Sequence, residues 1–278
     1  MAGVLVLAEA DAEGLRAISF ELIAAGVQLA GGGCGPVRVL IVAHDPSRHA
    51  AELSVPGVEE VLTVASPIEH FEPHLQATAV KAVIETERPQ VVLTANSADA
   101  MAYAPAVAAE LGLGFASGAT GLGWKDGAPV VTRSAHGGRL VAQLEFSGKP
   151  VVLVMVRSGA YAAVAPGGGS LAARQPTLTL DASLAGTEHL GYSQATSAEP
   201  ELSRSEFVVA IGRGVEDEAG VAELEGIART LGAAFSVSGG LVDSGLASPA
   251  RKVGVSGKTV RPKVYLALGI SGALQHLT

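Results

Sequence analysis

The sequence predicts an α/β fold with two domains, each a mostly parallel sheet flanked by helices. Short β-rich runs alternate with helical patterns through the first 165 residues, and the same alternation restarts near residue 206. Hydrophobic residues make up 48% of the 278 residues, which excludes a disordered chain and allows a large core. Residues 166–205 between the two parts are rich in Gly, Ser, Thr and Ala, as is typical of a linker.

The N-terminal α/β domain is expected over residues 1–165. Compact apolar runs predict buried strands at Val4–Ala8, Val37–Ala43, Val58–Val64 and Val91–Ala95. Apolar residues at helical spacing predict helices at Ala12–Ala30, Pro73–Glu87 and Ala98–Leu111. A hairpin-rich edge is expected from the runs that follow, Val130–Arg133, Leu140–Phe146 and Val151–Arg157. Within the linker, the short alternation at Leu178 and Leu180 is compatible with one more strand.

The second α/β domain is expected over residues 206–278, with strands at Phe207–Ile211, Ala233–Val237 and Lys263–Leu268. Acidic residues 216–218 favour a helix N-terminus, and the helix is expected to stop at Gly232. Each strand is followed by a glycine-rich turn: Gly212-Arg213-Gly214, Ser238-Gly239-Gly240 and Gly269-Ile270-Ser271-Gly272. In a doubly wound sheet, ligands bind outside the carboxyl ends of the strands, and glycine there lets the backbone approach them.

Residues 251–263 add five basic side chains and no acid to this domain. A local positive field of this kind suits an anionic ligand such as a phosphate, whereas a solvated basic loop is the alternative. Taken with the three glycine turns, the segment predicts a nucleotide-type ligand.

Composition disfavours several functional classes. The net charge of −8 is unlike that of nucleic-acid-binding proteins, so no nucleic-acid partner is expected. The lone Cys34 excludes an internal disulfide and a Cys-based zinc site, which fits a reducing cytoplasm. The N-terminus has no basic flank of a signal peptide, and no apolar stretch approaches the ~20 residues that span a bilayer, so no membrane insertion is expected.

The familiar catalytic and nucleotide motifs are incomplete. Asp217 stands where G-x-G-x-x-G needs its last glycine, and Lys252 stands where a phosphate loop ending at 257–259 needs its first. With no nucleophile elbow and no set of metal ligands, no catalytic or metal-binding residue is assigned. His276, beside the third glycine turn, could offer a proton or a positive charge to an acceptor on a ring.

A series of motifs occurs in order along the C-terminal part: Gly212-Arg213-Gly214-Val215, Ser238, Val242-Asp243-Ser244-Gly245, Val253-Gly254, Ser256-Gly257-Lys258, Pro262-Lys263-Val264-Tyr265, and the run from Gly269 to Leu277. Through them, residues 207–277 resemble the FAD-binding domain of the electron transfer flavoprotein alpha subunit. The N-terminal part agrees more loosely, at Ala104-Pro105, Thr132-Arg133 and Gly137-Gly138. The resemblance covers nearly the whole chain and implies a Rossmann-like (DHS-like) FAD domain at 206–278.

The resemblance implies an electron carrier rather than an enzyme. In that family the alpha subunit binds FAD and forms a heterodimer with a smaller beta subunit. The FAD carries electrons from flavin dehydrogenases such as acyl-CoA dehydrogenases to a quinone oxidoreductase or another acceptor. A flavin-free scaffold subunit that pairs with a beta subunit and a nucleotide-dependent oxidoreductase are the alternatives, and the expected location is cytoplasmic.

The resemblance also implies which residues bind FAD. Contacts to the flavin or its pyrophosphate are expected from Arg213, Ser238, Val253, Gly254, Val255 and Ser256. Ser256 takes the place of a threonine whose hydroxyl hydrogen-bonds flavin N5. A second set is expected to wrap the pyrophosphate and the ring, and it comprises Ser271, Gly272, Ala273, Leu274, Gln275 and His276.

Three departures from the family pattern bear on the flavin. Gly239 stands where the family has an arginine over the isoalloxazine, so a lower flavin reduction potential is expected unless Arg251 or Lys252 reaches across. Val255 stands where the family has a glutamine. The chain ends at Thr278, well before family members do, so the FAD-binding domain is expected to be incomplete at its C-terminus.

Overall fold

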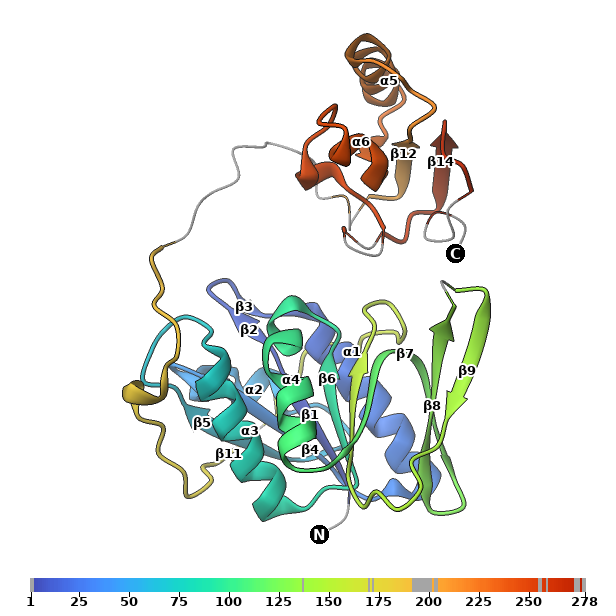
Figure 1. The fold of residues 1–278 in the computed structure, drawn as a ribbon. Coiled ribbons are helices and arrows are strands. Elements are labelled where there is room, and N and C mark those ends of the chain that lie inside the picture. The colour runs from blue at the N-terminus through green and yellow to red at the C-terminus, as the bar shows by residue number, and fades with distance from the viewer. Residues whose placement is uncertain are drawn as a thin grey trace. The chain divides into compact units, whose positions relative to one another are not determined.

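The structure is a computed structural model that describes residues 3–136, 138–169, 171, 173–191, 202, 205–254, 257–258, 260–272 and 276. The chain divides into two compact units, Met1–His136 with Leu140–Leu190, and Gly191–Thr278 with Gly137–Arg139. Each unit contains a mostly parallel sheet with helices packed on it, which confirms the predicted α/β class (Figure 1).

The N-terminal unit is built on a sheet of nine described strands: β1 (Val4–Ala8), β4 (Val37–Ala43), β5 (Val58–Ala65), β6 (Val91–Ala95), β7 (Gly114–Lys125), β8 (Ala128–Ala135), β9 (Leu140–Leu144), β10 (Val152–Val156) and β11 (Ala173–Arg174). Their order is β11-β5-β4-β1-β6-β10-β7-β8-β9. Neighbours are parallel from β11 to β7 and antiparallel from β7 to β9. The predicted hairpin edge is therefore confirmed for β8 and β9.

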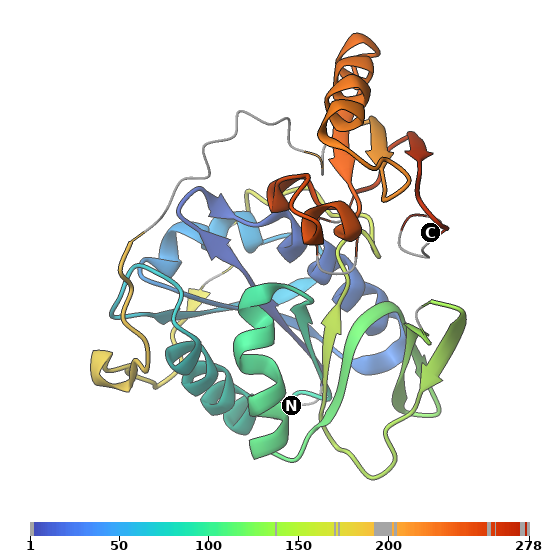
Figure 2. The same cartoon turned by 45° about the horizontal axis from the view of Figure 1, so that its top comes forward.

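Helices cover both faces of this sheet (Figures 1 and 2). They are α1 (Ala17–Leu29), α2 (Ala50–Leu53), α3 (Pro73–Glu87) and α4 (Ala98–Glu110), with short turns η1 (Ala30–Cys34), η2 (Pro46–His49) and η3 (Ala182–Leu184). In β1, Val4, Val6 and Ala8 belong to the apolar cluster under α1, and Leu5 and Leu7 belong to the cluster under α3 and α4. Every residue of β1 is buried, as expected for a parallel strand covered on both sides.

Two predicted elements differ from the structure. The helix predicted from Ala12 begins at Ala17, because the residues before it pair as a hairpin of β2 (Ala10–Asp11) and β3 (Gly14–Leu15). The prediction that Val151–Arg157 lies in a hairpin-rich edge is wrong. β10 lies inside the sheet, parallel to β6 and β7, and all five of its residues are buried, which is the pattern of a central parallel strand.

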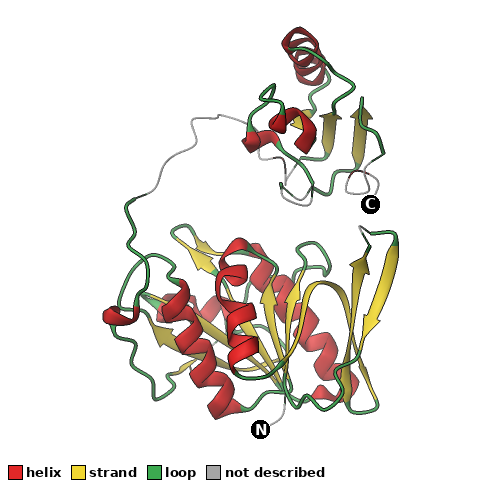
Figure 3. Cartoon of the chain, in the orientation of Figure 1, coloured by secondary structure: helices red, strands yellow, loops and turns green. Residues whose placement is uncertain are grey.

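Residues 166–190, which the sequence predicts to be part of a linker over 166–205, group with the N-terminal unit. The segment has little regular structure (Figure 3), yet β11 pairs with β5. Arg174 of β11 forms ion pairs with Glu60 (2.6 Å) and Glu87 (2.7 Å). These hydrogen bonds raise the pKa of Arg174, which stays charged.

The rest of that segment closes against the start of α3. Leu178 and Leu180 form no strand, contrary to the prediction, but Leu180 is buried in the cluster under α3 and α4. The buried Glu72 carboxylate accepts hydrogen bonds from Gly186 N (3.0 Å) and Thr187 Oγ1 (3.2 Å). These contacts hold the segment against the start of α3.

One stretch of the described chain, Ala17–Cys34, is long and apolar enough to cross a membrane by length and composition, with a mean hydropathy of 1.3 over 18 residues. This corrects the expectation that no apolar run comes near that length. Half of the stretch is buried, and Leu22 and Ile23 of α1 have no exposed surface where α1 packs on β1. Packing in the core accounts for its apolar character.

The C-terminal unit has a parallel sheet whose described strands are β12 (Phe207–Ile211), β13 (Ala234–Val237) and β14 (Val264–Leu268), in the order β13-β12-β14. Its helices are α5 (Glu218–Thr230) and α6 (Gly239–Asp243), with a short turn η5 (Pro249–Arg251). The strands lie where predicted. α5 begins after Asp217, whose carboxylate accepts a hydrogen bond from Gly220 N (2.8 Å), and it ends before Gly232, which has a positive φ.

Candidate functional site

The carboxyl ends of β12, β13 and β14 lie at one edge of their sheet, because the strands are parallel. The chain passes from β12 to β13 on one side and then crosses to β14 on the other side of β12. The edge between β12 and β14 is therefore a topological switch point, where open α/β sheets bind their ligands. The glycine turns 212–214 and 269–272 follow these two strands.

The two turns contact each other through their backbones. Gly212 N donates to Leu268 O (2.9 Å), and Gly214 N donates to Gly269 O (2.9 Å). A Cβ at Gly212 would stand 2.5 Å from Gly269 O, and a Cβ at Gly214 would stand 2.7 Å from Gly269 Cα. Glycine is required at both positions, because the two strand ends approach too closely for a side chain.

Four predicted site residues come together at this edge. Ser238 follows β13, and its N–H donates to Ile211 O (2.8 Å) at the end of β12. Val253 is buried, and its N–H donates to Val237 O (3.0 Å), which brings Val253 and Gly254 beside Ser238. Arg213 is exposed and extends over Gly240.

His276 packs against Tyr265 of β14. Its Nδ1 lies 2.6 Å from Tyr265 Oη, whereas its Nε2 is buried with no hydrogen-bond partner among the residues that the structure describes. Burial lowers the pKa of His276, so the imidazole is neutral at physiological pH. A buried nitrogen of this kind is satisfied in native proteins by a protein group, a water or a ligand.

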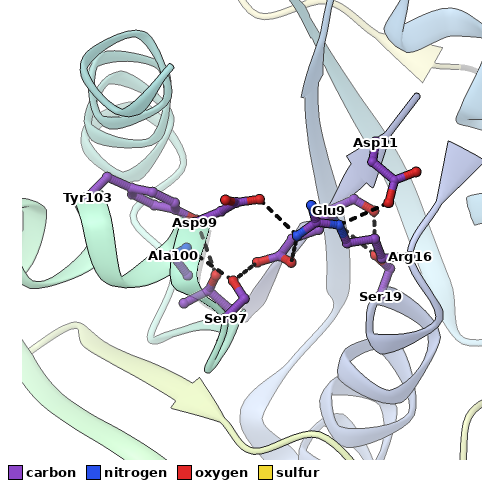
Figure 4. Close-up of polar contacts among 9 residues, drawn as sticks. Glu9, Asp11, Arg16, Ser19, Ser97, Asp99, Ala100 and Tyr103 are labelled. Atoms are coloured by element: carbon purple, nitrogen blue, oxygen red, sulfur yellow. Dashed lines mark hydrogen bonds and ion pairs between the residues drawn. The ribbon is translucent and has the colours of Figure 1, made fainter. Parts of the chain in front are cut away.

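The N-terminal sheet has a switch point of the same kind between β1 and β6, and a polar network closes it (Figure 4). Glu9, directly after β1, accepts a hydrogen bond from the hydroxyl of Ser97 (2.6 Å), the N-cap of α4. Arg16 forms ion pairs with Glu9 (3.3 Å), Asp11 (3.2 Å) and Asp99 (2.8 Å). The charged groups of this network are satisfied by one another.

Burial is the largest influence on the pKa of Glu9 and raises it above the ordinary value, although hydrogen bonding to Ser97 and the charge of Arg16 oppose the shift. The folded state therefore holds the proton of Glu9 more tightly than the unfolded state does. Stability from this effect is fully present below the unfolded pKa and is lost as the pH rises through the folded pKa.

We expect the stability of Glu9→Gln to depend less on pH than that of the wild type. As the pH rises from about 4 to 7, the wild type should lose unfolding free energy relative to the variant. Urea denaturation at several pH values measures the difference, and Glu13→Gln, the same change at an exposed position of the hairpin, is the control. Parallel stability curves for wild type and Glu9→Gln would refute the role of burial.

Comparison with known proteins identifies the family. Residues 4–183 match the family model described as "Electron transfer flavoprotein domain", and residues 201–278 match "Electron transfer flavoprotein FAD-binding domain". A relative named electron transfer flavoprotein subunit alpha from Bacillus subtilis is 31% identical, over 99% of this chain and 83% of the relative. The chain belongs to the electron transfer flavoprotein alpha subunit family. Relatives of the same name from Methylophilus methylotrophus and Pseudomonas aeruginosa are 28% and 30% identical, over 100% and 99% of this chain and 86% and 85% of their own lengths.

The cofactor of the family's second domain is FAD. The groups gathered at the C-terminal edge fit a dinucleotide: a guanidinium, a hydroxyl, glycine turns at the switch point and, following the third turn, a buried imidazole nitrogen without a described partner. The predicted site residues that the structure describes are Arg213, Ser238, Val253, Gly254, Ser271, Gly272 and His276. Those that lie outside the described residues are Val255, Ser256, Ala273, Leu274 and Gln275.

Two cations of the basic segment 251–263 form ion pairs with carboxylates. Arg251 forms a bidentate ion pair with Glu225 (2.8 and 3.0 Å) and lies over the ring of Phe235. Lys263, just before β14, pairs with Glu206, just before β12 (2.7 Å), so this ion pair lies at the amino end of the C-terminal sheet. These two fit the alternative of a structural, solvated loop. Within the described residues Lys252 has no ion pair.

Glu9, Arg16 and Ser97 are not among the residues that the sequence predicts for a site. The sequence feature that could have indicated them is their position. Glu9 and Ser97 lie just beyond two predicted strands, and these strands flank a switch point in the structure. Cys34 is buried, and burial raises the pKa of its thiol to about 11, so it is unreactive at neutral pH.

Proposed function

We propose that the chain is an electron carrier that holds FAD at the carboxyl edge of β12, β13 and β14. The proposal is supported by the difference between the switch point of the N-terminal sheet and that of the C-terminal sheet. The Glu9 network closes the N-terminal one, whereas the C-terminal one has glycine turns, an exposed Arg213 and, beyond the last turn, the buried Nε2 of His276. In the described chain, the second edge therefore offers unsatisfied polar groups to a ligand.

When bound, FAD supplies the redox chemistry, since its isoalloxazine ring accepts and returns electrons. Arg213 would bind negative charge on the cofactor, and Ser238 would hydrogen-bond its polar groups. If Tyr265 donates to His276 Nδ1, the imidazole proton lies on Nε2, which would then donate to a carbonyl oxygen of the cofactor. The buried Val253 would exclude water from the strand end. Val255, Ser256 and residues 273–275 join the proposed site on the resemblance alone.

For the donors we propose flavin dehydrogenases such as acyl-CoA dehydrogenases, and for the acceptor a quinone oxidoreductase or another protein. A beta subunit is the proposed partner, because the relatives are named alpha subunits. The edge strand β9 also leaves the apolar side chains Leu140 and Val141 57% and 73% exposed, which suits a partner surface. The free buried thiol of Cys34 fits the predicted cytoplasmic location.

The test is to purify the full chain together with the beta subunit from the same organism. The visible absorbance of the complex and the FAD released on denaturation should show bound flavin, which a flavin dehydrogenase should reduce and an acceptor should reoxidise. A colourless complex that takes up no FAD on reconstitution would contradict the carrier and support a flavin-free scaffold subunit.

A further inference from the structure

Two cationic side chains lie over adjacent glycines just beyond the end of β13. A Cβ at Gly239 would stand 3.1 Å from Lys252 Cε and 3.5 Å from Lys252 Nζ. A Cβ at Gly240 would stand 2.6 Å from Arg213 Cδ and 2.8 Å from Arg213 Nε. Because these glycines directly follow Ser238, both cations lie at the carboxyl edge of the sheet.

The side chain of Lys252 is held along its length. Its backbone forms a parallel bridge with Val237, the last residue of β13, and its carbonyl accepts a hydrogen bond from Lys258 N (2.8 Å). A Cβ at Gly257 would stand 2.9 Å from Lys252 Cγ, so the stem passes Gly257 and its ammonium ends over Gly239. Side chains at these two glycines would compete with Lys252 for the same space.

Within the part of the chain that the structure describes, neither cation is neutralised. Among the described residues, no carboxylate lies within ion-pair distance of Arg213 or Lys252, whereas the neighbouring Arg251 is paired with Glu225. The acidic residue of α6, Asp243, is at the other end of that helix from Gly239. Like charges held near each other repel, and an anionic ligand that contacts both relieves the repulsion.

We propose that Lys252 and Arg213 form an anion subsite for FAD, and that Gly239 and Gly257 admit the Lys252 side chain to it. The inference rests on the proposed function, because FAD is the ligand. Two parts of FAD share the required chemistry: the diphosphate, which is always anionic, and the isoalloxazine ring, which gains negative charge on reduction. From the sequence, position 239 carries no cation. In the structure, Lys252 brings one there from another part of the chain.

The first experiment measures FAD binding to the full chain by fluorescence titration at low and high salt. Lys252→Met should weaken binding about tenfold at low salt and reduce its salt dependence, because one charged contact is lost. Lys252→Arg keeps the charge and should stay near the wild type. Lys263→Met removes the same charge at the amino end of the sheet and should change the affinity by less than about twofold. Thermal unfolding confirms that each variant is folded.

A second variant disturbs the same subsite without changing the charge of any residue. Gly239→Val should displace the Lys252 ammonium, and the backbone tolerates it because Gly239 is helical and has no positive φ. FAD binding should weaken as in Lys252→Met. The double variant should be no weaker than Lys252→Met alone, because the two changes remove the same contact.

Two further measurements distinguish whether the subsite contacts the diphosphate or the isoalloxazine ring of FAD. If the subsite faces the diphosphate, Lys252→Met weakens binding of ADP as much as that of FAD and leaves the flavin reduction potential unchanged. If it faces the ring, ADP binding is unchanged and the potential falls. Either result supports the subsite. Unchanged FAD affinity and potential in Lys252→Met overturn it, whereas a wild type that binds no FAD overturns the proposed function and the subsite with it.

Discussion

Replacing Glu87 by glutamine is expected to lower the free energy of unfolding of the N-terminal unit by about 3 kcal/mol. The Glu87 side chain is only 10% exposed and pairs with Arg38, which is 6% exposed, and with Arg174 (2.7 Å). Glutamine keeps the size of the side chain but removes its charge, so the buried guanidinium of Arg38 loses a buried, charged partner. Removing one partner of a buried pair costs far more than removing an exposed charge.

The matched control is Glu85→Gln, the same change at an exposed position of α3, which should alter stability by less than about 0.5 kcal/mol. Urea denaturation followed by circular dichroism gives both values. Because Arg174 also loses a partner, amide hydrogens in 166–190 should exchange faster in Glu87→Gln. Equal effects of the two variants would show that the buried pair adds nothing to stability.

Gly212→Ala is expected to have the largest effect in the C-terminal unit. Its new methyl group would stand 2.5 Å from Gly269 O and 2.9 Å from Ile270 Cα, and backbone atoms cannot rotate away as a side chain can. The end of β14 must then move away from β12. We expect a loss of about 2 kcal/mol of unfolding free energy, as is usual for overpacking, together with weaker FAD binding at the widened switch point.

Gly226→Ala is the matched control and should change stability in the opposite direction. Gly226 lies inside α5, and a Cβ there meets nothing within 4 Å. Alanine favours the helix over glycine by about 0.5–1 kcal/mol, so this variant should be more stable than the wild type and bind FAD normally. Thermal unfolding of both variants measures the contrast, and a stabilising or neutral Gly212→Ala would mean that the two strand ends are not in close contact.

Elements with strong local signals could be predicted from the sequence. α3 has a proline at its first position and an acceptor in Glu72 just before it, and its predicted bounds match. β7 has no such signal, since glycines interrupt it at 114, 118, 121 and 123, and pairing with β10 and β8 holds it in the sheet. The placement of 166–190 also depends on distant partners, because Arg174 meets Glu60 and Glu87 far away in sequence.

The candidate site likewise has features that the sequence predicts and features that depend on residues distant in sequence. The glycine turns after β12 and β14 could be predicted, because each directly follows an apolar run. The sequence names Arg251 and Lys252 as the two cations able to reach across to Gly239, but it does not show which of them does. That depends on the parallel bridge that brings residue 252 beside Val237, on the space left at Gly239 and on the pairing of Arg251 with Glu225. The Glu9 network was equally hidden, since Glu9 and Ser97 meet only once β1 and β6 lie side by side.

Amide hydrogen exchange of the full chain, with and without FAD, tests most directly the claim that FAD binds at the carboxyl edge of β12, β13 and β14. We predict that FAD slows exchange in the turns 212–215, 238–240, 252–254 and 269–272, and leaves exchange around Glu9 and Ser97 unchanged. Slower exchange around Glu9 and Ser97, with no change in the C-terminal turns, would contradict the claim.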